Sequence, residues 1–268
     1  MKLMVVHSLA VHGTASLKAF LSILGTRVLP VPSLYLTGLT NLPQVLKVGT
    51  HFAAMLEGSL ELARLRGQSV TLYVGYLGSP DQADVILGQM EAYQDVIEGL
   101  IVDPVSGDHG RTYVPKAVVE AWPKLLAKAQ WAFPNFTELT LLGGLAPTSS
   151  AYSYQDHLQA FSQKYPSLNF IATSLPLGST LGLALYHAGE NVVHEHPKLS
   201  QNFGGSGDIF AAYFLNYYLY QGWNAPQAMQ QAATHAVEII ERAMAMDSPD
   251  LPLVSQGDER GKSPKWGS

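Results

Sequence analysis

The chain has 268 residues, of which 47% are hydrophobic and 14% are charged, so it can bury a sizeable core and is unlike disordered proteins. Its formal net charge of -5 disfavours nucleic acid as a partner, because binding to a phosphate backbone depends on clustered Lys and Arg. It has no cysteine, which excludes disulfides, thiolate metal sites and a cysteine nucleophile and fits a reducing compartment.

The first residues resemble a signal peptide only superficially. The apolar run Leu3–Val6 is short and is followed by His7 and Ser8, so it predicts a buried first strand. No uninterrupted apolar stretch approaches the roughly 20 residues that a membrane-spanning helix needs. We therefore expect a cytoplasmic protein without a membrane partner.

Short β-branched or aromatic runs then alternate with longer stretches of helical periodicity. This alternation predicts an α/β protein with a central, mostly parallel sheet flanked by helices. Several of the runs are apolar throughout, as expected when helices cover both faces of the sheet. The predicted strands are Leu3–Val6, Val28–Leu36, Val70–Val74, Leu100–Val102, Trp131–Phe133 and Asn169–Ala172.

The pattern changes in the last third of the chain. The runs Thr180–His187 and Asn191–Glu195 are separated by a short glycine-containing turn, which predicts a hairpin and an antiparallel edge of the sheet. Helices are expected over Ile209–Tyr220 and Pro226–Met244, and the proline suits a first helical turn.

The domain organisation is simple. The chain has no internal repeat and no linker rich in Gly, Pro or Ser, so we expect a single domain over residues 1–248. The segment 249–268 has several charged residues close together and lacks periodic apolar positions, which predicts a flexible C-terminal tail.

A glycine-rich turn, Gly204-Gly205-Ser206-Gly207-Asp208, leads into the predicted helix Ile209–Tyr220. Glycines let backbone N–H groups converge and a helix start adds partial positive charge, so the turn predicts an anion hole. Asp208 has two interpretations. It caps the helix, since Asp is favoured at N-caps, or it is a general base that takes a proton from an alcohol during phosphoryl transfer.

A second motif, at residues 133–138, follows the strand that ends at Phe133. Ligands of parallel sheets gather at the carboxyl ends of strands, so Asn135 and Glu138 are expected where a bound nucleotide holds a metal ion. Such oxygen ligands suit Mg²⁺, often through water. The alternative is a capping box, with Asn135 as the N-cap and Glu138 as the third helical residue.

A third motif begins where the strand ending at Val102 reaches Asp103. The glycine-bearing segment 104–115, which contains Asp108 and Tyr113, is expected to fold over a substrate as a lid. The alternative for Asp103 is a turn residue at the end of a strand.

In this order, the three motifs resemble the ribokinase-like superfamily and, within it, the pyridoxal kinases. Those proteins carry Asp-Pro-Val with a following Gly-Asp and Tyr-Val-Pro, then Pro-Asn-x-x-Glu, then Gly-x-Gly-Asp. The segment 75–79, Gly-Tyr-Leu-Gly-Ser, is similar to the family's segment after the third strand, and Ser8 with Gly13 is similar to its opening segment. The resemblance covers about Leu3 to Met244 and implies a three-layer fold and a homodimer.

The resemblance implies a role for each matching residue. Asp208 would be the base, and Gly205, Ser206 and Gly207 would form the anion hole. Mg²⁺ would lie near Asp103, Asn135 and Glu138. The other residues implied to contact ATP or belong to its lid are Asp108, Tyr113, Thr173 and Ser174. Those implied to contact the pyridine ring of a vitamin B6 substrate are Ser8, Thr40 and Tyr76.

The implied activity is transfer of phosphate from ATP to the 5′-hydroxymethyl group of pyridoxal, pyridoxine or pyridoxamine. Two alternatives stay open: a hydroxymethylpyrimidine kinase of thiamin synthesis and a vitamer-binding protein without turnover. The chain departs from the family at residues 14–16, at Leu36 and at residues 39–42, which concern ring recognition. Phe133 stands where many members have a Thr near a monovalent cation, which argues against a potassium site.

Overall fold

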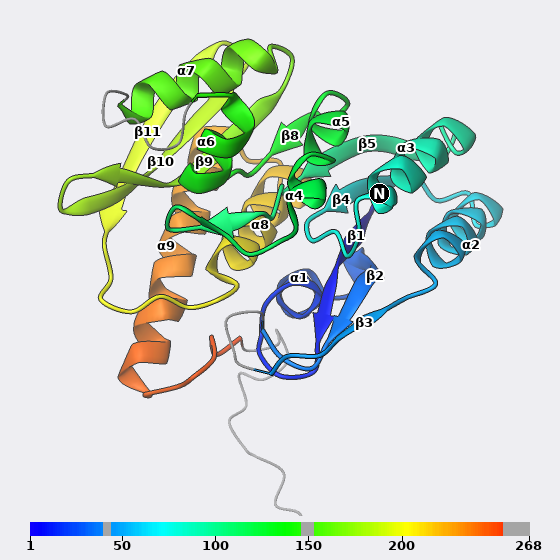
Figure 1. Cartoon of the computed structure of the whole chain (residues 1–268), viewed down its shortest axis with the longest axis horizontal. Coiled ribbons are helices and arrows are strands. Elements are labelled where there is room, and N and C mark those ends of the chain that lie inside the picture. The colour runs from blue at the N-terminus through cyan, green and yellow to red at the C-terminus, as the bar shows by residue number, and fades with distance from the viewer. Residues whose placement is uncertain (40–43, 146–152, 254–268) are drawn as a thin grey trace, which may run out of the picture.

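A nine-stranded sheet runs through the computed structural model of the protein, which describes residues 1–39, 44–145 and 153–253 (Figure 1). From one edge to the other, the strands are β11 (Glu190–Pro197), β10 (Thr180–His187), β9 (Asn169–Leu177), β8 (Trp131–Ala132), β5 (Ile97–Val102), β4 (Val70–Val74), β1 (Lys2–Ala10), β2 (Val28–Leu36) and β3 (Lys47–Gly49). Neighbours from β9 to β2 are parallel. The pairs β9–β10, β10–β11 and β2–β3 are antiparallel. The predicted mostly parallel sheet with an antiparallel edge hairpin is therefore confirmed.

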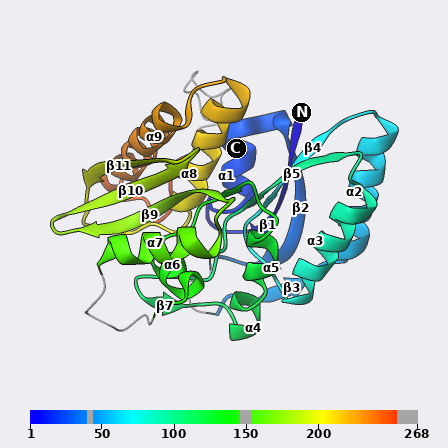
Figure 2. The same cartoon turned by 90° about the horizontal axis from the view of Figure 1, so that it is seen from above.

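Two helical layers cover the faces of the sheet, which makes the fold three-layered (Figure 2). One layer consists of α1 (Leu17–Leu24), α8 (Ser206–Leu215) and α9 (Ala225–Ala245). The other consists of α2 (Phe52–Leu65), α3 (Asp81–Ala92), α4 (Lys116–Val119), α5 (Trp122–Leu126), α6 (Phe136–Gly143) and α7 (Tyr154–Lys164). The 3-10 turn η1 (Gly25–Arg27) follows α1.

Strand β1 explains why the chain needs both layers. Leu3 and Val5 belong to the core under α1, α8 and α9, whereas Met4 and Val6 belong to the core on the opposite face. Successive side chains of a strand point to opposite faces, so a strand that is apolar throughout must be covered twice. All four side chains are 0% exposed.

The two predicted C-terminal helices are present with shifted bounds. α8 begins at Ser206 rather than at Ile209, and it passes into a single π-helical turn, η2 (Asn216–Tyr220), within the predicted range. α9 has Pro226 in its first turn, as predicted. Short β3, on the edge opposite the hairpin, was not predicted, because three residues are too few for a recognisable alternation.

The ends of the fold differ from expectation in one respect. Leu251 is 1% exposed, and its carbonyl oxygen accepts a hydrogen bond of 2.8 Å from Thr14 Oγ1. The expected tail therefore does not begin at residue 249, because this buried side chain keeps the chain packed through Leu251. Residues 254–268 lie outside the described part of the chain. Within the described residues, no helix is both long and apolar enough to cross a membrane.

Candidate active site

A pocket of about 390 Å³ lies beyond the carboxyl ends of the parallel strands, where α8 begins. Most of the predicted site residues meet there. The predicted residues that line the pocket are Ser8, Tyr76, Asp103, Asp108, Tyr113, Asn135, Glu138, Thr173, Gly205, Ser206, Gly207 and Asp208. Ser174 follows Thr173 in β9 but is not among the described lining residues, so its contact with ATP stays a prediction. Thr40 lies outside the described residues.

The glycine turn forms one wall of the pocket. Gly205 is the N-cap of α8 with φ of 93°, and no side chain caps this helix. A Cβ at Gly205 would lie 2.6 Å from the Cβ of Ala15 and 2.8 Å from its Cα, so only glycine fits at this position. A Cβ at Gly207 would meet nothing within 4 Å. The start of α8 is thus open on the pocket side, with uncapped N–H groups that can bind an anion.

Asp208 does not cap its own helix, so that interpretation is wrong. Its Oδ2 accepts a hydrogen bond of 2.7 Å from the backbone N–H of Ser16, and its Oδ1 lies 3.0 Å from Nε2 of His7. The carboxylate therefore turns toward β1 and α1, away from the first turn of α8, and it lines the pocket with a side chain 10% exposed. An ionised carboxylate held this way can accept a proton from a bound hydroxyl group.

The capping box at α6, by contrast, is present as one of the two interpretations predicted. The Oδ1 of Asn135 accepts from the N–H of Glu138 at 3.0 Å, and Oε2 of Glu138 accepts from the N–H of Asn135 at 3.0 Å. Both residues nevertheless line the pocket, where Oε1 of Glu138 also accepts from the N–H of Ser106 at 2.8 Å. Thr173 lies beside them, since its N–H donates to the carbonyl of Pro134 at 2.9 Å. The cap thus fixes two polar side chains at the rim.

Buried carboxyl groups gather in the pocket. Burial, and then the neighbouring charge of Asp103, raise the pKa of Glu138 well above its usual value, although hydrogen bonds from backbone N–H groups act against this. Burial and the charge of Asp208 raise the pKa of Asp103 to about 7, while His7 and the hydrogen bond from Tyr73 lower it. The Tyr73 hydroxyl donates to Oδ2 of Asp103 at 2.9 Å.

This electrostatic environment fits a bound cation. Among the described lining residues there is no Lys or Arg to balance Asp103, Glu138 and Asp208. No group of three or more His, Asp or Glu side chains in the described part of the chain is arranged to ligate a metal directly. Mg²⁺ commonly keeps several waters and takes one or two carboxylates together with substrate phosphates, so these residues suit Mg²⁺ better than a metal held only by protein.

The lid segment covers one side of the pocket. Its short hairpin consists of β6 (Gly107–Asp108) and β7 (Arg111–Thr112) and contributes Asp108, His109 and Tyr113 to the lining. The hairpin is tied to α6, because the N–H of Gly110 donates to Thr137 Oγ1 at 2.9 Å. The predicted lid segment therefore forms a hairpin next to the capping box, and its closure over a substrate stays a prediction.

The predicted substrate side is partly aromatic and apolar. Tyr76 is 5% exposed, and Leu36 and Leu39 lie in the same lining. The hydroxyl of Ser8 donates to Ser16 Oγ at 2.9 Å. Lys47 Nζ lies 3.4 Å from the hydroxyl of Tyr76. This side can hold a small planar ring.

Several lining residues were not predicted, among them His7, Ser16, Asn202 and Phe203. His7 follows the apolar run of the first strand directly, next to the predicted Ser8, and that position was an available signal. Asn202 and Phe203 precede the glycine turn in a loop, and no local pattern distinguishes them.

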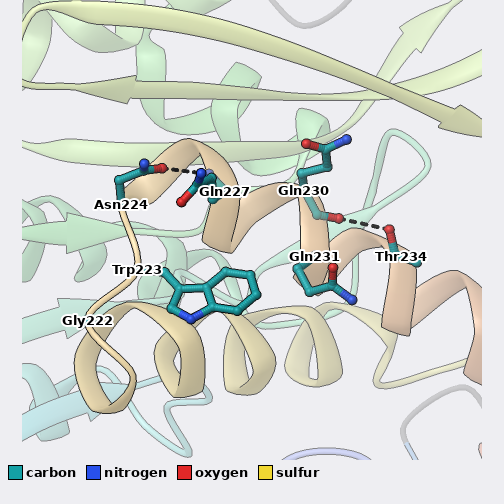
Figure 3. Close-up of a pocket in the computed structure, with 7 residues that line it drawn as sticks. All are labelled: Gly222, Trp223, Asn224, Gln227, Gln230, Gln231 and Thr234. Carbon is teal, nitrogen blue, oxygen red and sulfur yellow. Dashed lines mark hydrogen bonds between the residues drawn. The ribbon is translucent and has the colours of Figure 1, made fainter.

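A second and larger hollow, of about 840 Å³, lies between the end of η2 and α9 (Figure 3). It is lined by Gly222, Trp223, Asn224, Gln227, Gln230, Gln231 and Thr234. Asn224 caps α9, with its Oδ1 accepting from the N–H of Gln227 at 2.9 Å. None of these side chains titrates near neutral pH, so this hollow offers no acid, base or carboxylate metal ligand. The chemistry is therefore expected in the smaller pocket.

The three-layer fold and the pocket at the start of α8 define a ribokinase-like kinase that acts on a small-molecule alcohol. A pyridoxal kinase of Arabidopsis thaliana is 30% identical to the chain over 242 residues, which cover 82% of the chain and 73% of that relative. A candidate pyridoxal kinase of Saccharomyces cerevisiae is 36% identical over 126 residues, 42% of the chain but only 38% of that relative. The chain belongs to the pyridoxal kinase family. No protein-family model matches it.

Solved structures share the fold over most of the chain. A Bacteroides thetaiotaomicron protein, described as a candidate phosphomethylpyrimidine kinase and solved with pyridoxal, is 26% identical with a TM-score of 0.79 and covers 90% of this chain and 88% of its own. The pyridoxal kinase of Leishmania donovani, solved with ADP and pyridoxamine, is 22% identical with a TM-score of 0.77 and covers 96% and 92%. The second likeness shows the fold alone.

Proposed function

We propose that the protein transfers the γ-phosphoryl group of ATP to the 5′-hydroxymethyl group of pyridoxal, with pyridoxine and pyridoxamine as further acceptors. The observation that carries the proposal is the position of Asp208. Its carboxylate lines the same pocket as the uncapped, glycine-bearing start of α8. A base and an anion site next to each other are what phosphoryl transfer to an alcohol requires.

Asp208 and the start of α8 have different roles in this reaction. Asp208 takes the proton of the hydroxyl group, whose oxygen forms a bond to the γ-phosphorus. The bond between this phosphorus and the bridging oxygen of ATP breaks, and ADP leaves with the electron pair. The N–H groups of Ser206 and Gly207, at the start of α8, stabilise negative charge on the transferred group.

Mg²⁺ would be held by Asp103 and Glu138, with Asn135 nearby, and would neutralise charge on the phosphates of ATP. The support is the excess of buried carboxylates in a lining that has no Lys or Arg among its described residues. Asp108, Tyr113 and Thr173 line the pocket on the side of the lid and β9, where they would contact ATP. Ser8 and Tyr76 would contact the ring of the vitamer.

Replacement of Asp208 by Asn tests the proposal, because the variant keeps the shape of the side chain and removes its basicity. The kcat for ADP release with pyridoxal as the acceptor is expected to fall by roughly 100-fold or more. The affinity for ADP should stay close to that of the unmodified protein. Asp84→Asn is the control, since Asp84 is an exposed carboxylate that lies 2.6 Å from Lys124 Nζ. Near-normal turnover in Asp208→Asn would remove Asp208 from this role.

A second candidate is a hydroxymethylpyrimidine kinase, because the Bacteroides structure combines that description with bound pyridoxal. The ratio of kcat/KM for pyridoxal and for hydroxymethylpyrimidine separates the two activities. A strong preference for the pyrimidine would overturn the proposal. Binding of pyridoxal without ADP release from any alcohol would instead favour a vitamer-binding protein.

The proposal also includes a homodimer in the cytoplasm. The dimer rests on the family resemblance, and the compartment is consistent with the cysteine-free composition. Light scattering coupled to size-exclusion chromatography would measure a mass close to twice the 29.0 kDa of the chain. A mass of one chain at micromolar concentration would contradict the dimer.

A further inference from the structure

His7 lies in a closely fitted position beside Asp208. It is 2% exposed and stands where the pairing of β1 with β2 shifts register, between His7 and Ser8. Its ring lies 6.5 Å from that of Tyr73, nearly parallel at 13°, and 6.4 Å from that of Phe20. A Cβ at Gly75 would come within 2.0 Å of His7 Cδ2 and 2.3 Å of its Nε2, so the imidazole fits only because residue 75 is glycine.

One ring nitrogen of His7 is already used. The N–H of Ser8 donates to Nδ1 at 2.9 Å, and a nitrogen that accepts a hydrogen bond cannot carry a proton. Nε2 is therefore the ring nitrogen that is free to carry a proton.

The other nitrogen faces the carboxylate. Nε2 lies 3.0 Å from Oδ1 of Asp208, although this contact does not have the alignment of a full hydrogen bond. Oδ2 of the same carboxylate accepts from the N–H of Ser16 at 2.7 Å. Asp208 is thus held at Oδ2 by the backbone at the start of α1, and its Oδ1 lies against the imidazole. Each oxygen keeps a further lone pair for a substrate hydroxyl.

The charges around the ring come from several elements. Asp208 faces it from α8, and Asp103, at the end of β5, lies beyond Tyr73, whose hydroxyl it binds. Phe20 of α1 and Tyr73 of β4 contribute only rings to its surroundings. Among the described residues that line the pocket there is no Lys or Arg that would pair with Asp208.

We propose that His7 is a positioning residue for Asp208, and that it orients this carboxylate through Nε2. The proposal rests on the function proposed above for Asp208. An N–H of Nε2 next to Oδ1 would fix the direction of the carboxylate, and a general base must be aligned with the proton that it takes. A buried histidine that only filled space in the core would have no effect through Asp208.

A double-mutant cycle separates these two roles. The variants are His7→Phe, Asp208→Asn and the two combined, measured by ADP release with pyridoxal. His7→Phe is expected to lower kcat roughly 10- to 100-fold with the KM for ATP unchanged, because a misplaced base slows only the chemical step. In the Asp208→Asn background the same substitution should change kcat less than about 3-fold, since residues that act through one another are non-additive. Equal factors in both backgrounds would overturn the proposal.

Two further variants control for folding. His7→Gln keeps a neutral N–H donor and is expected to recover kcat to within about 10-fold of the unmodified protein. A His7→Gln protein that is folded but as slow as His7→Phe would contradict the proposal. His157→Phe removes the other histidine that is buried among the described residues, outside the pocket lining, and should leave kcat unchanged.

A measurement on the unmodified protein covers the case in which His7→Phe does not fold. Nitrogen-15 NMR of the imidazole should show a proton on Nε2 of His7. A proton on Nδ1 alone would overturn the proposal, because Nε2 could then not donate to Asp208. If Asp208→Asn itself keeps full turnover, the proposed function fails; if it is inactive and the cycle is additive, only the role of His7 fails.

Discussion

Two helices begin at the pocket, and each carries an acidic side chain at its third residue: Glu138 in α6 and Asp208 in α8. The two carboxylates are used differently. Glu138 returns to the N–H of Asn135 and closes a capping box, whereas Asp208 leaves its own helix and accepts from the N–H of Ser16. The difference follows from the N-cap residue, since Asn135 has a side-chain acceptor and Gly205 has none.

The comparison shows how one helix start is closed and the other is left open to a ligand. In α6, the cap satisfies N–H groups from within the chain, and the buried Glu138 adds a carboxyl group that can bind a cation in its ionised form. In α8, no side chain satisfies the first N–H groups, so they are available to an anion. A phosphate group with its metal ion is a ligand that matches both helix starts at once.

The largest effect is expected from a substitution at the uncapped start of α8. Gly205→Ala should lower kcat by roughly 100-fold or more, because the left-handed backbone and the 2.6 Å approach to Ala15 cannot both persist with a Cβ. The free energy of unfolding should fall by about 1–3 kcal/mol. Steady-state kinetics and urea unfolding measure the two effects.

Gly207→Ala is the matched control, because its Cβ would meet nothing within 4 Å. Its free energy of unfolding should stay within about 0.5–1 kcal/mol of the unmodified protein, the ordinary range for a tolerated glycine replacement. A fall in kcat in this stable variant would come from a methyl group placed toward the phosphoryl group. If Gly205→Ala is as stable and active as Gly207→Ala, the turn is not a tightly constrained anion site.

The open start also shows what the sequence could predict. The spacing of glycines before an apolar helix was enough to locate the uncapped start of α8, because its geometry is local. The side-chain partner of Asp208 was not predictable in this way, since Ser16 and Asp208 are 192 residues apart and meet only through the packing of α1 against α8. The same holds for His7, whose position depends on Gly75, directly after β4.

The capping box of α6 shows that a structural role and a place in the pocket can coincide. A capping box was predicted for Asn135 and Glu138 as an alternative to a metal-binding role, as if one excluded the other. In the folded chain the cap is present and both residues line the pocket. The strands and α9 were predictable because hydrophobic periodicity marks them, whereas three-residue β3 leaves too little pattern to recognise.

A smaller effect is expected from pH at Asp103. Its pKa is about 7 in the folded protein and 3.8 as the ordinary value, so between these pH values the folded state binds a proton that the unfolded state does not. The free energy of unfolding of the metal-free protein should therefore fall as pH rises from about 4 to about 7, by on the order of 4 kcal/mol at most. Asp103→Asn should remove this part of the pH dependence.

Added Mg²⁺ sharpens this test. A metal ion binds the ionised carboxylates and competes with protons, so it should raise the free energy of unfolding more at pH 8 than at pH 6. Thermal unfolding at both pH values, with and without Mg²⁺, measures the difference. Equal stabilisation at the two pH values would contradict the assignment of Asp103 to the metal. An unchanged pH dependence of the metal-free Asp103→Asn variant would contradict the raised pKa of Asp103.

The smallest effect is expected at Asn135, where the helix-capping role can be separated from a role in binding Mg²⁺. Asn135→Ala removes one half of the capping box and should lower the free energy of unfolding by about 1 kcal/mol. Asn224→Ala removes the cap of α9, far from the carboxylates, and should cost a similar amount. Only Asn135→Ala is expected to raise the Mg²⁺ concentration needed for half-maximal ADP release, by roughly 3- to 10-fold, because Asn135 also fixes the lid through Gly107. Equal magnesium dependence in both variants would show that Asn135 acts as a helix cap alone.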